Sequence, residues 1–213
     1  MRNVKPHEER RQEILETSAR LFFDKGYAKT KITDIIEEIG MSKGIFYYYF
    51  ESKEDVMNAI IIDMIEKDVA DARKIADDKA LNAHEKVYRI ITQRNSKISK
   101  KNHDFMKQFK EVENPEIFIK AIRMGMSKLL PILSEVVEQG IREGVFNLEY
   151  PYETIELLMC AHTHQSLIIN QRKDAHSRGA YIRMMENSLG AEKGSFNYLR
   201  DMMKGCKGVC END

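Results

Sequence analysis

A run of three tyrosines in the first quarter of the chain carries the most distinctive chemistry of the sequence. The stretch reads Ser42-Lys43-Gly44-Ile45-Phe46-Tyr47-Tyr48-Tyr49. Phenol hydroxyls and lysine ammonium groups donate hydrogen bonds to phosphate oxygens, and phenol rings can also meet base edges or a thymine methyl group. If a helix begins near Lys43, its first N–H groups add partial positive charge that suits a phosphate, and Gly44 lets a partner approach the backbone closely. The chemistry of this stretch indicates contact with nucleic acid.

Packing in a hydrophobic core is the alternative role for these aromatic residues. Three consecutive residues span about 200° of a helix, so one small domain cannot bury all three tyrosines. Phe46 and Phe50 are four residues apart and share one helix face. We therefore expect the two phenylalanines to point inward and Tyr48 to face outward.

Three helices are expected to position this stretch. The first runs from about residue 8 to residue 25, where apolar residues recur on one helix face. Thr30 is a candidate N-cap for a short second helix, which Gly40 ends. Ser42 is a candidate N-cap for a third helix, which reaches about Tyr49. Two short helices joined by a short turn that contains glycine describe a helix-turn-helix unit.

The rest of the chain is predicted to be helical as well, so the expected fold class is all-α. Among 213 residues there are 11 Gly and 4 Pro, and alternating β-branched runs are absent. A break or kink is expected near Pro131 in the helix that begins at Pro115. The further expected helices cover residues 53–77, 84–99, 103–112, 115–143 and 151–171.

The expected helix 151–171 is apolar on two sides. One stripe consists of Ile155, Leu158, Met159 and His162, and the other of Leu157, Cys160, Ala161, His164 and Ile168. A helix that is apolar on two sides must be covered on two sides. We expect one side to face its own domain and the other to face a partner subunit.

Composition excludes several classes of protein. The chain has 34 Lys+Arg and 34 Asp+Glu, which argues against coating nucleic acid through bulk charge but leaves room for a local basic face. No stretch approaches the roughly 20 apolar residues of a membrane span, and the first residues contain no secretory signal core. Three cysteines without framework spacing fit a reducing cytoplasm. Recognisable catalytic motifs are absent, so we predict a cytoplasmic protein that is not an enzyme and needs no cofactor.

The first 55 or so residues resemble the TetR (tetracycline-repressor-like) family of transcriptional regulators. The matching positions are Ile14-Leu15, Leu21-Phe22, Gly26-Tyr27, Thr30, Ile32, Asp34-Ile35, Gly40, Ser42, Gly44, Tyr47, Phe50 and Lys53. A weaker similarity lies in residues 140–146, which resemble the turn before that family's dimerisation helices. The resemblance implies an N-terminal three-helix DNA-binding domain, residues 1–53, followed by a larger helical effector-binding and dimerisation domain, residues 54–213.

The resemblance also implies partners and site residues. Thr30, Tyr47 and Lys53 stand where the family binds backbone phosphate, and Thr33, Lys43, Tyr48 and Tyr49 stand where it touches bases or phosphates. With Ser42 and Gly44 at the helix start, these residues form the predicted DNA-binding set. The expected protein is a homodimeric repressor that binds a near-palindromic double-stranded operator and is released by a small-molecule effector, with one reading helix per subunit.

Two further groups of residues leave alternatives open. Several mostly apolar residues could line an effector cavity or equally well belong to an ordinary core. The candidates for the cavity are Phe105, Phe109, Phe118, Met124, Met159 and His162. A metal or redox sensor, or an enzyme, is the alternative indicated by His162, His164, Cys206 and Cys210. Helix residues two apart point about 200° away from each other, so we do not predict a metal site. A last alternative keeps the helical dimer but uses the N-terminal domain to bind protein.

Overall fold

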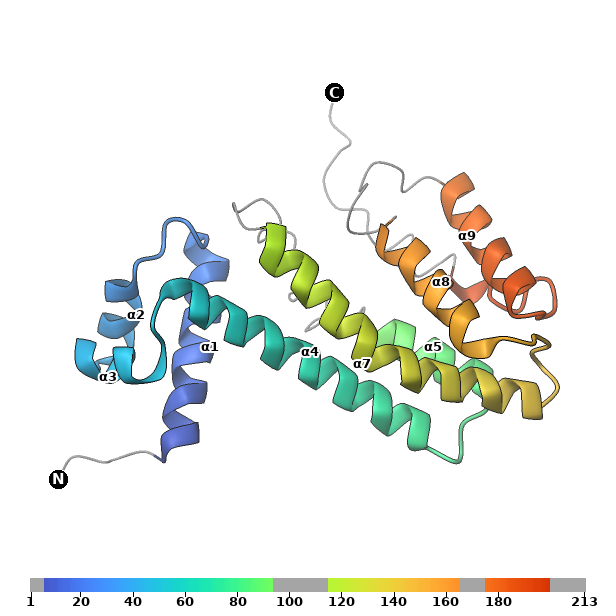
Figure 1. The fold of residues 1–213 in the computed structure, drawn as a ribbon, viewed down its shortest axis with the longest axis horizontal. Coiled ribbons are helices and arrows are strands. Elements are labelled where there is room, and N and C mark those ends of the chain that lie inside the picture. The colour runs from blue at the N-terminus through green and yellow to red at the C-terminus, as the bar shows by residue number, and fades with distance from the viewer. Residues whose placement is uncertain (1–5, 94–114, 165–174, 200–213) are drawn as a thin grey trace. The chain divides into compact units, whose positions relative to one another are not determined.

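The computed structural model describes residues 6–93, 115–164 and 175–199, and these residues form helices joined by turns (Figure 1). The predicted all-α fold class is confirmed. The helices of the described residues are α1 (His7–Lys25), α2 (Ile32–Ile39), α3 (Lys43–Tyr49), α4 (Lys53–Asp77), α5 (Ala83–Gln93), α7 (Pro115–Arg142), α8 (Pro151–Thr163) and α9 (Ala175–Ser188).

The predicted helix boundaries agree closely with the structure where both ends of a helix are described, and the predicted ends of helices 84–99 and 151–171 lie outside the described residues. Helices α3 and α4 have the predicted bounds. The predicted break near Pro131 is wrong, because α7 is a single helix that contains this proline on its exposed side. The predicted helix 103–112 lies outside the described residues.

Contacts within the chain divide the described residues into two units, and the division falls inside α4 and α7. The first unit holds residues 6–68 and 115–124, and the second holds the remaining described residues. The predicted domain boundary after residue 53 stays a prediction, and the contacts group the first turns of α4 with the first three helices. The physical reason is that Val56, Met57 and Ile60 on α4 are buried in the same core as the first three helices.

The core of the first unit fixes α3 against α1 and α2. Ile14 and Phe22 on α1, Ile35 on α2 and Phe46 on α3 are almost completely buried in one apolar cluster. The buried residues of α1 recur at helical spacing, as the sequence predicts. The short α3 is thus held by its buried side chain as well as by its own backbone hydrogen bonds.

The core of the second unit contains a close approach between α7 and the turn that follows it. Phe146 lies against Gly140, where an added Cβ would overlap the phenylalanine ring. The Phe146 ring stacks on Phe196 with a centroid separation of 6.0 Å, and His84 lies 5.0 Å from each of these two rings. Glycine at position 140 is therefore a packing requirement.

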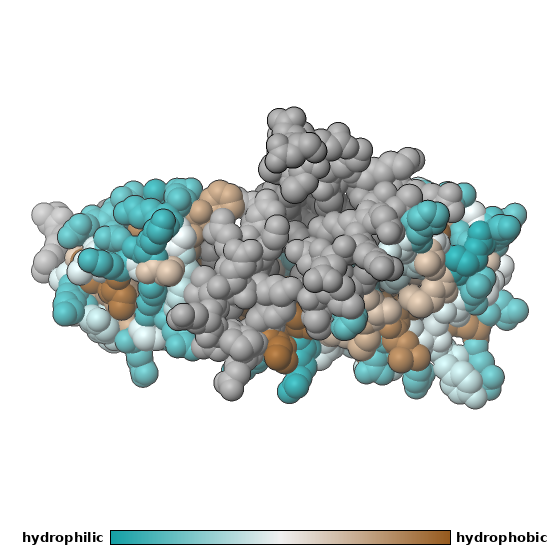
Figure 2. Space-filling view, turned by 90° about the horizontal axis from the view of Figure 1, so that it is seen from above, coloured by the Kyte–Doolittle hydropathy of each residue, from teal (hydrophilic) through white to brown (hydrophobic). Residues whose placement is uncertain are grey.

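On the face drawn in Figure 2, the described residues show hydrophilic areas and separate apolar patches. No helix in the described ranges combines the length and the apolar character that crossing a membrane requires.

Candidate nucleic-acid interface

A tight turn joins α2 to α3 and sets the direction of α3. Gly40 adopts a left-handed conformation (φ 70°, ψ 36°), and its N–H donates to the Ile36 carbonyl at 3.0 Å. Ser42 caps α3, because its hydroxyl accepts the Ile45 N–H at 3.3 Å. The N-cap role predicted for Ser42 is confirmed. Together these residues complete a helix-turn-helix unit.

The two faces of α3 differ as the sequence predicts. Phe46 and Phe50 are buried, with 0% and 3% of their surfaces exposed, so they anchor the helix to the core. Tyr48 on the other face is 72% exposed and Tyr47 is 44% exposed, while Tyr49 is half-buried. The solvent-exposed face of α3 therefore carries phenol hydroxyls and rings.

The polar and small residues of the predicted set are exposed as well. Thr33, Ser42, Lys43 and Gly44 are all exposed. The Lys43 ammonium lies 5.8 Å from the Tyr47 ring centroid. An added Cβ at Gly44 would meet nothing within 4 Å, so packing inside the unit gives no reason for glycine at this position.

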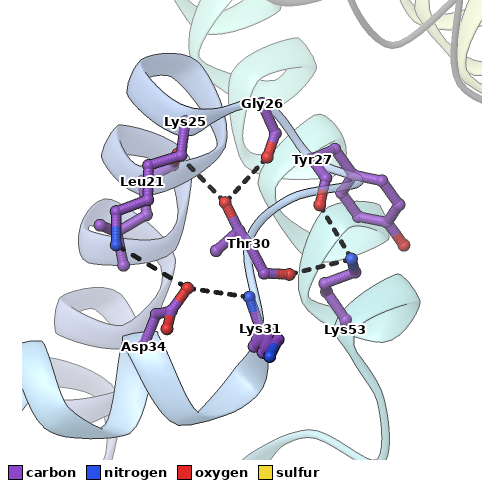
Figure 3. Close-up of polar contacts among 8 residues, drawn as sticks. All are labelled: Leu21, Lys25, Gly26, Tyr27, Thr30, Lys31, Asp34 and Lys53. Atoms are coloured by element: carbon purple, nitrogen blue, oxygen red, sulfur yellow. Dashed lines mark hydrogen bonds and ion pairs between the residues drawn. The ribbon is translucent and has the colours of Figure 1, made fainter.

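Thr30 lies inside the loop between α1 and α2 (Figure 3). It is 1% exposed, and its hydroxyl oxygen lies 2.8 Å from the Gly26 carbonyl and 3.2 Å from the Leu21 carbonyl, either of which accepts its proton. Its N–H also points to carbonyls of the same loop. The structure thus gives Thr30 a role in holding the loop, and the phosphate contact that the family resemblance implies for it stays a prediction.

The predicted N-cap role of Thr30 also needs correction. Helix α2 begins at Ile32, so its N-cap is Lys31. The Lys31 N–H donates to the Asp34 carboxylate at 3.1 Å, and that carboxylate lies 3.8 Å from the Lys25 ammonium. The Asp34 carboxylate therefore pairs with the N–H of the N-cap residue, and the Thr30 hydroxyl points back towards the end of α1.

Lys53 closes the same loop from α4. Its ammonium donates to the Tyr27 carbonyl at 2.8 Å and to the Thr30 carbonyl at 3.0 Å, and it lies 4.2 Å from the centroid of the Tyr27 ring (Figure 3). Desolvation by partial burial lowers the pKa of the Lys53 ammonium. Two of its three donors are therefore used within the protein, and the phosphate contact that the family resemblance implies for Lys53 stays a prediction.

Two residues beside the exposed tyrosines are missing from the predicted set. Ile45 is 40% exposed on α3, and its position one residue before Phe46 could have revealed its outward direction from helical geometry. His7 at the start of α1 lies with its ring centroid 5.8 Å from that of Tyr48 and 4.7 Å from that of Tyr49. No local pattern links His7 to α3, because this contact depends on tertiary packing.

The second unit leaves one stripe of α8 uncovered within the described chain. Ile155 and Leu158 are buried and Met159 is partly buried. On the other stripe, Leu157 is 70% exposed and Cys160 is exposed. A shallow groove beside it is lined by Thr154, Leu157, Leu158, Met184 and Ser188.

The predicted effector cavity stays a prediction, because half of its candidate side chains lie outside the described residues. Phe105 and Phe109 lie outside these residues, and so does the side chain of Phe118. Met124 is partly buried on α7, whereas His162 on α8 is exposed, with its ring 5.5 Å from that of Tyr181. The groove on α8 and α9 includes none of the candidate residues.

The metal or redox alternative receives no support from the described residues. Within them, no three His, Cys, Asp or Glu side chains gather closely enough to hold a metal ion. His164 is exposed at the end of α8, and Cys206 and Cys210 lie outside the described residues.

The geometry of the first unit defines a class of protein. A capped helix is joined by a glycine turn to the preceding helix, is anchored by buried aromatics and presents hydroxyls and an ammonium group to the outside. These are the features of a helix-turn-helix nucleic-acid-binding protein.

Comparisons with known proteins identify the family. The family model for bacterial regulatory proteins of the tetR family matches residues 14–60, and the model for the tetracyclin repressor-like C-terminal domain matches residues 97–174. The chain therefore belongs to the TetR family of transcriptional regulators. Members of this family are regulators and not enzymes, and the chain is a DNA-binding regulator by membership.

Individual relatives agree with this assignment. The HTH-type regulator YdgC of Bacillus subtilis (strain 168) is 26% identical over 182 residues, which cover 82% of this chain and 89% of YdgC. YerO of the same organism is 49% identical over 49 residues, 23% of this chain and 17% of YerO. A TetR/AcrR-family regulator from Thermobifida fusca shares the fold with a TM-score of 0.62 and 22% identity, over 87% of this chain and 99% of that one.

Proposed function

We propose that the chain binds a near-palindromic DNA operator as a homodimer and that α3 of each subunit reads the major groove. The observation that carries this proposal is the orientation of the aromatic run, with Tyr48 72% exposed while Phe46 is fully buried on the opposite face. The proposed contact residues are Thr33, Ser42, Lys43, Gly44, Ile45, Tyr47, Tyr48 and Tyr49.

Each part of this surface suits a different feature of DNA. The Lys43 ammonium and the Tyr47 hydroxyl donate to phosphate oxygens, which sets the register of the helix on the duplex. The Tyr48 ring and the Ile45 side chain meet base edges and thymine methyl groups. Gly44 removes the side chain where the backbone of α3 comes nearest to the duplex.

The uncovered stripe of α8 supports the homodimer. Leu157, at 70% exposure, and the neighbouring Met184, at 37%, form an apolar surface that a second copy would bury. Two copies related by a two-fold axis present two α3 helices to successive half-sites. The substitution Leu157→Asp is expected to convert dimer to monomer in analytical ultracentrifugation, whereas Glu156→Ala on the same helix leaves the dimer intact.

Family membership further supports repression that a small-molecule effector relieves. Such an effector must bind the DNA-competent and DNA-incompetent states with different affinities.

The odd number of cysteines, without disulfide spacing, supports a cytoplasmic location for the protein and its effector. Thermal-shift screening is the direct search for the effector, since a ligand that prefers the folded state raises the melting temperature.

The test of DNA reading starts from duplexes that the protein selects from a random pool. Tyr48→Ala is expected to weaken binding to the selected duplex by about 5- to 150-fold, the range of one good base contact, and to relax the base preference at one position of each half-site. Tyr150→Ala, at an exposed tyrosine of the second unit, is the matched control and leaves affinity unchanged. Equal affinity of wild type and Tyr48→Ala for the duplex would refute this reading role.

The alternative in which the N-terminal domain binds protein predicts a different salt response. Binding to DNA releases counterions, so affinity falls steeply and linearly on a logarithmic scale as salt rises. If the protein selects no DNA sequence and its affinity for duplexes does not fall with salt in this way, α3 does not bind DNA.

A further inference from the structure

We propose that His7 is a positioning residue that orders Tyr48 and Tyr49 for DNA reading before DNA arrives. This inference rests on the proposed function, because it assigns a role at the same surface. The three rings contact one another in pairs. The centroid distances are 5.8 Å for His7–Tyr48, 4.7 Å for His7–Tyr49 and 5.1 Å for Tyr48–Tyr49.

The ring orientations give these contacts a favourable geometry. His7 meets Tyr48 at an interplanar angle of 79°, and Tyr48 meets Tyr49 at 88°, so both pairs are edge-to-face. Aromatic rings at right angles attract because the positive edge of one faces the negative face of the other. The His7 ring thus contacts both tyrosines from a different helix.

This contact matters because Tyr48 has little else to restrain it. A side chain that is 72% exposed samples several rotamers, and binding must then restrict it to one. His7 restricts the rotamers of Tyr48 in the free protein, so Tyr48 loses less conformational entropy when the duplex binds. Without the imidazole, this entropy is lost on binding, and the affinity falls.

The position of His7 separates this role from a contribution to folding. His7 is exposed at the first residue of α1, and the first buried residue of that helix is Ile14, about two turns further on. The arginines of the first turns are engaged elsewhere, with Arg10 bound to Glu13 at 2.6 Å and Arg11 over the Phe50 ring at 5.6 Å. The only ring contacts of His7 within the described residues are those with the two tyrosines.

The experiment uses the full chain and a fluorescently labelled duplex with the sequence that the wild-type protein selects. His7→Ala is expected to raise the Kd by about 3- to 10-fold, as one aromatic pair would. His7→Phe keeps a ring at this place and is expected to bind within twofold of wild type. His176→Ala, at an exposed histidine of α9, is the matched control.

Three further readouts distinguish positioning from other roles. The melting temperature of His7→Ala stays at the wild-type value, and so does the dependence of its affinity on salt. In a Tyr48→Ala background, His7→Ala costs much less than in the wild type, because the effect acts through the tyrosine.

Three results would overturn the inference. The first is wild-type affinity for His7→Ala. The second is an equal loss of DNA affinity in His7→Ala and His7→Phe together with a weaker dependence of affinity on salt, which would show that the imidazole contacts a DNA phosphate. The third is a double variant whose loss of DNA-binding free energy equals the sum of the losses in His7→Ala and Tyr48→Ala alone. If the wild-type protein selects no duplex at all, the proposed function fails instead, so the two failures are distinguishable.

Discussion

Lys53 offers the sharpest test of how the N-terminal unit works, because its position in the family pattern and its position in the structure predict different outcomes. The resemblance places it on a DNA phosphate. The structure places its ammonium on the carbonyls of Tyr27 and Thr30 and over the Tyr27 ring. The informative substitution is Lys53→Met, which keeps the apolar stem and removes the charged donor.

The expected loss of stability follows from these contacts. A hydrogen bond to a charged group contributes about 1.5–3 kcal/mol when it is well protected, but Lys53 is partly exposed, so water replaces much of each bond. Allowing about 1 kcal/mol for each bond, we expect a loss of about 2 kcal/mol. For a chain of this length that is a fall of about 4–8 °C in the melting temperature.

The assay compares two lysines of the same unit without and with DNA. In the free protein, Lys53→Met is expected to melt earlier and to exchange the amides of residues 26–31 faster, whereas Lys43→Met keeps wild-type values. With DNA, Lys43→Met is expected to reduce the salt slope by about 0.9 per protomer, the value for one lost phosphate contact, and Lys53→Met by clearly less. An unchanged melting temperature for Lys53→Met together with a full reduction in slope would refute the reasoning.

Three other substitutions test single features. Gly44→Ala is expected to stabilise the free protein by up to about 1 kcal/mol, because alanine favours a helix, and to weaken operator binding; unchanged affinity would show that the backbone does not approach DNA there. Gly140→Ala is expected to lower the free energy of unfolding in urea by about 1–3 kcal/mol, because its methyl group would overlap the Phe146 ring; a neutral result contradicts that packing. Burial lowers the pKa of His84, and the charge of Glu143 opposes this shift. The neutral imidazole therefore contributes its full stability above the ordinary pKa of 6.5, and this stability is lost as the pH falls through the lowered pKa of the folded protein. His84→Gln is expected to flatten this pH dependence in urea titrations between about pH 7 and pH 5, and an unchanged dependence would assign it to other groups.

The parts of the fold that the sequence predicts well are those set by local chemistry. Ser42 caps α3 as its residue type predicts, and Gly40 ends α2 in the left-handed conformation that glycine favours. The inward direction of Phe46 and Phe50 and the outward direction of Tyr48 follow from helical periodicity alone.

The parts that the sequence does not predict depend on contacts between distant segments. Thr30 has the residue type of an N-cap, but its hydroxyl bonds to carbonyls at the end of α1, and α2 begins after Lys31, whose N–H donates to Asp34. The contact of His7 with the tyrosines joins segments from two different helices. The division of the chain inside α4 likewise follows from which core buries each turn of that helix.

Agreement with a family pattern therefore has two different physical sources in this unit, and they differ in how strongly they indicate DNA binding. Thr30 and Lys53 match the pattern, yet hydrogen bonds within the protein are sufficient reason for both residues. Gly44 also matches the pattern but has no such reason, because glycine at 44 relieves no contact inside the unit. Tyr48, which stands where the family touches bases or phosphates, is mostly exposed. A matching residue that no contact inside the fold requires leaves room for a role outside the fold, so the exposed face of α3 is stronger evidence for DNA binding than the buried matches are.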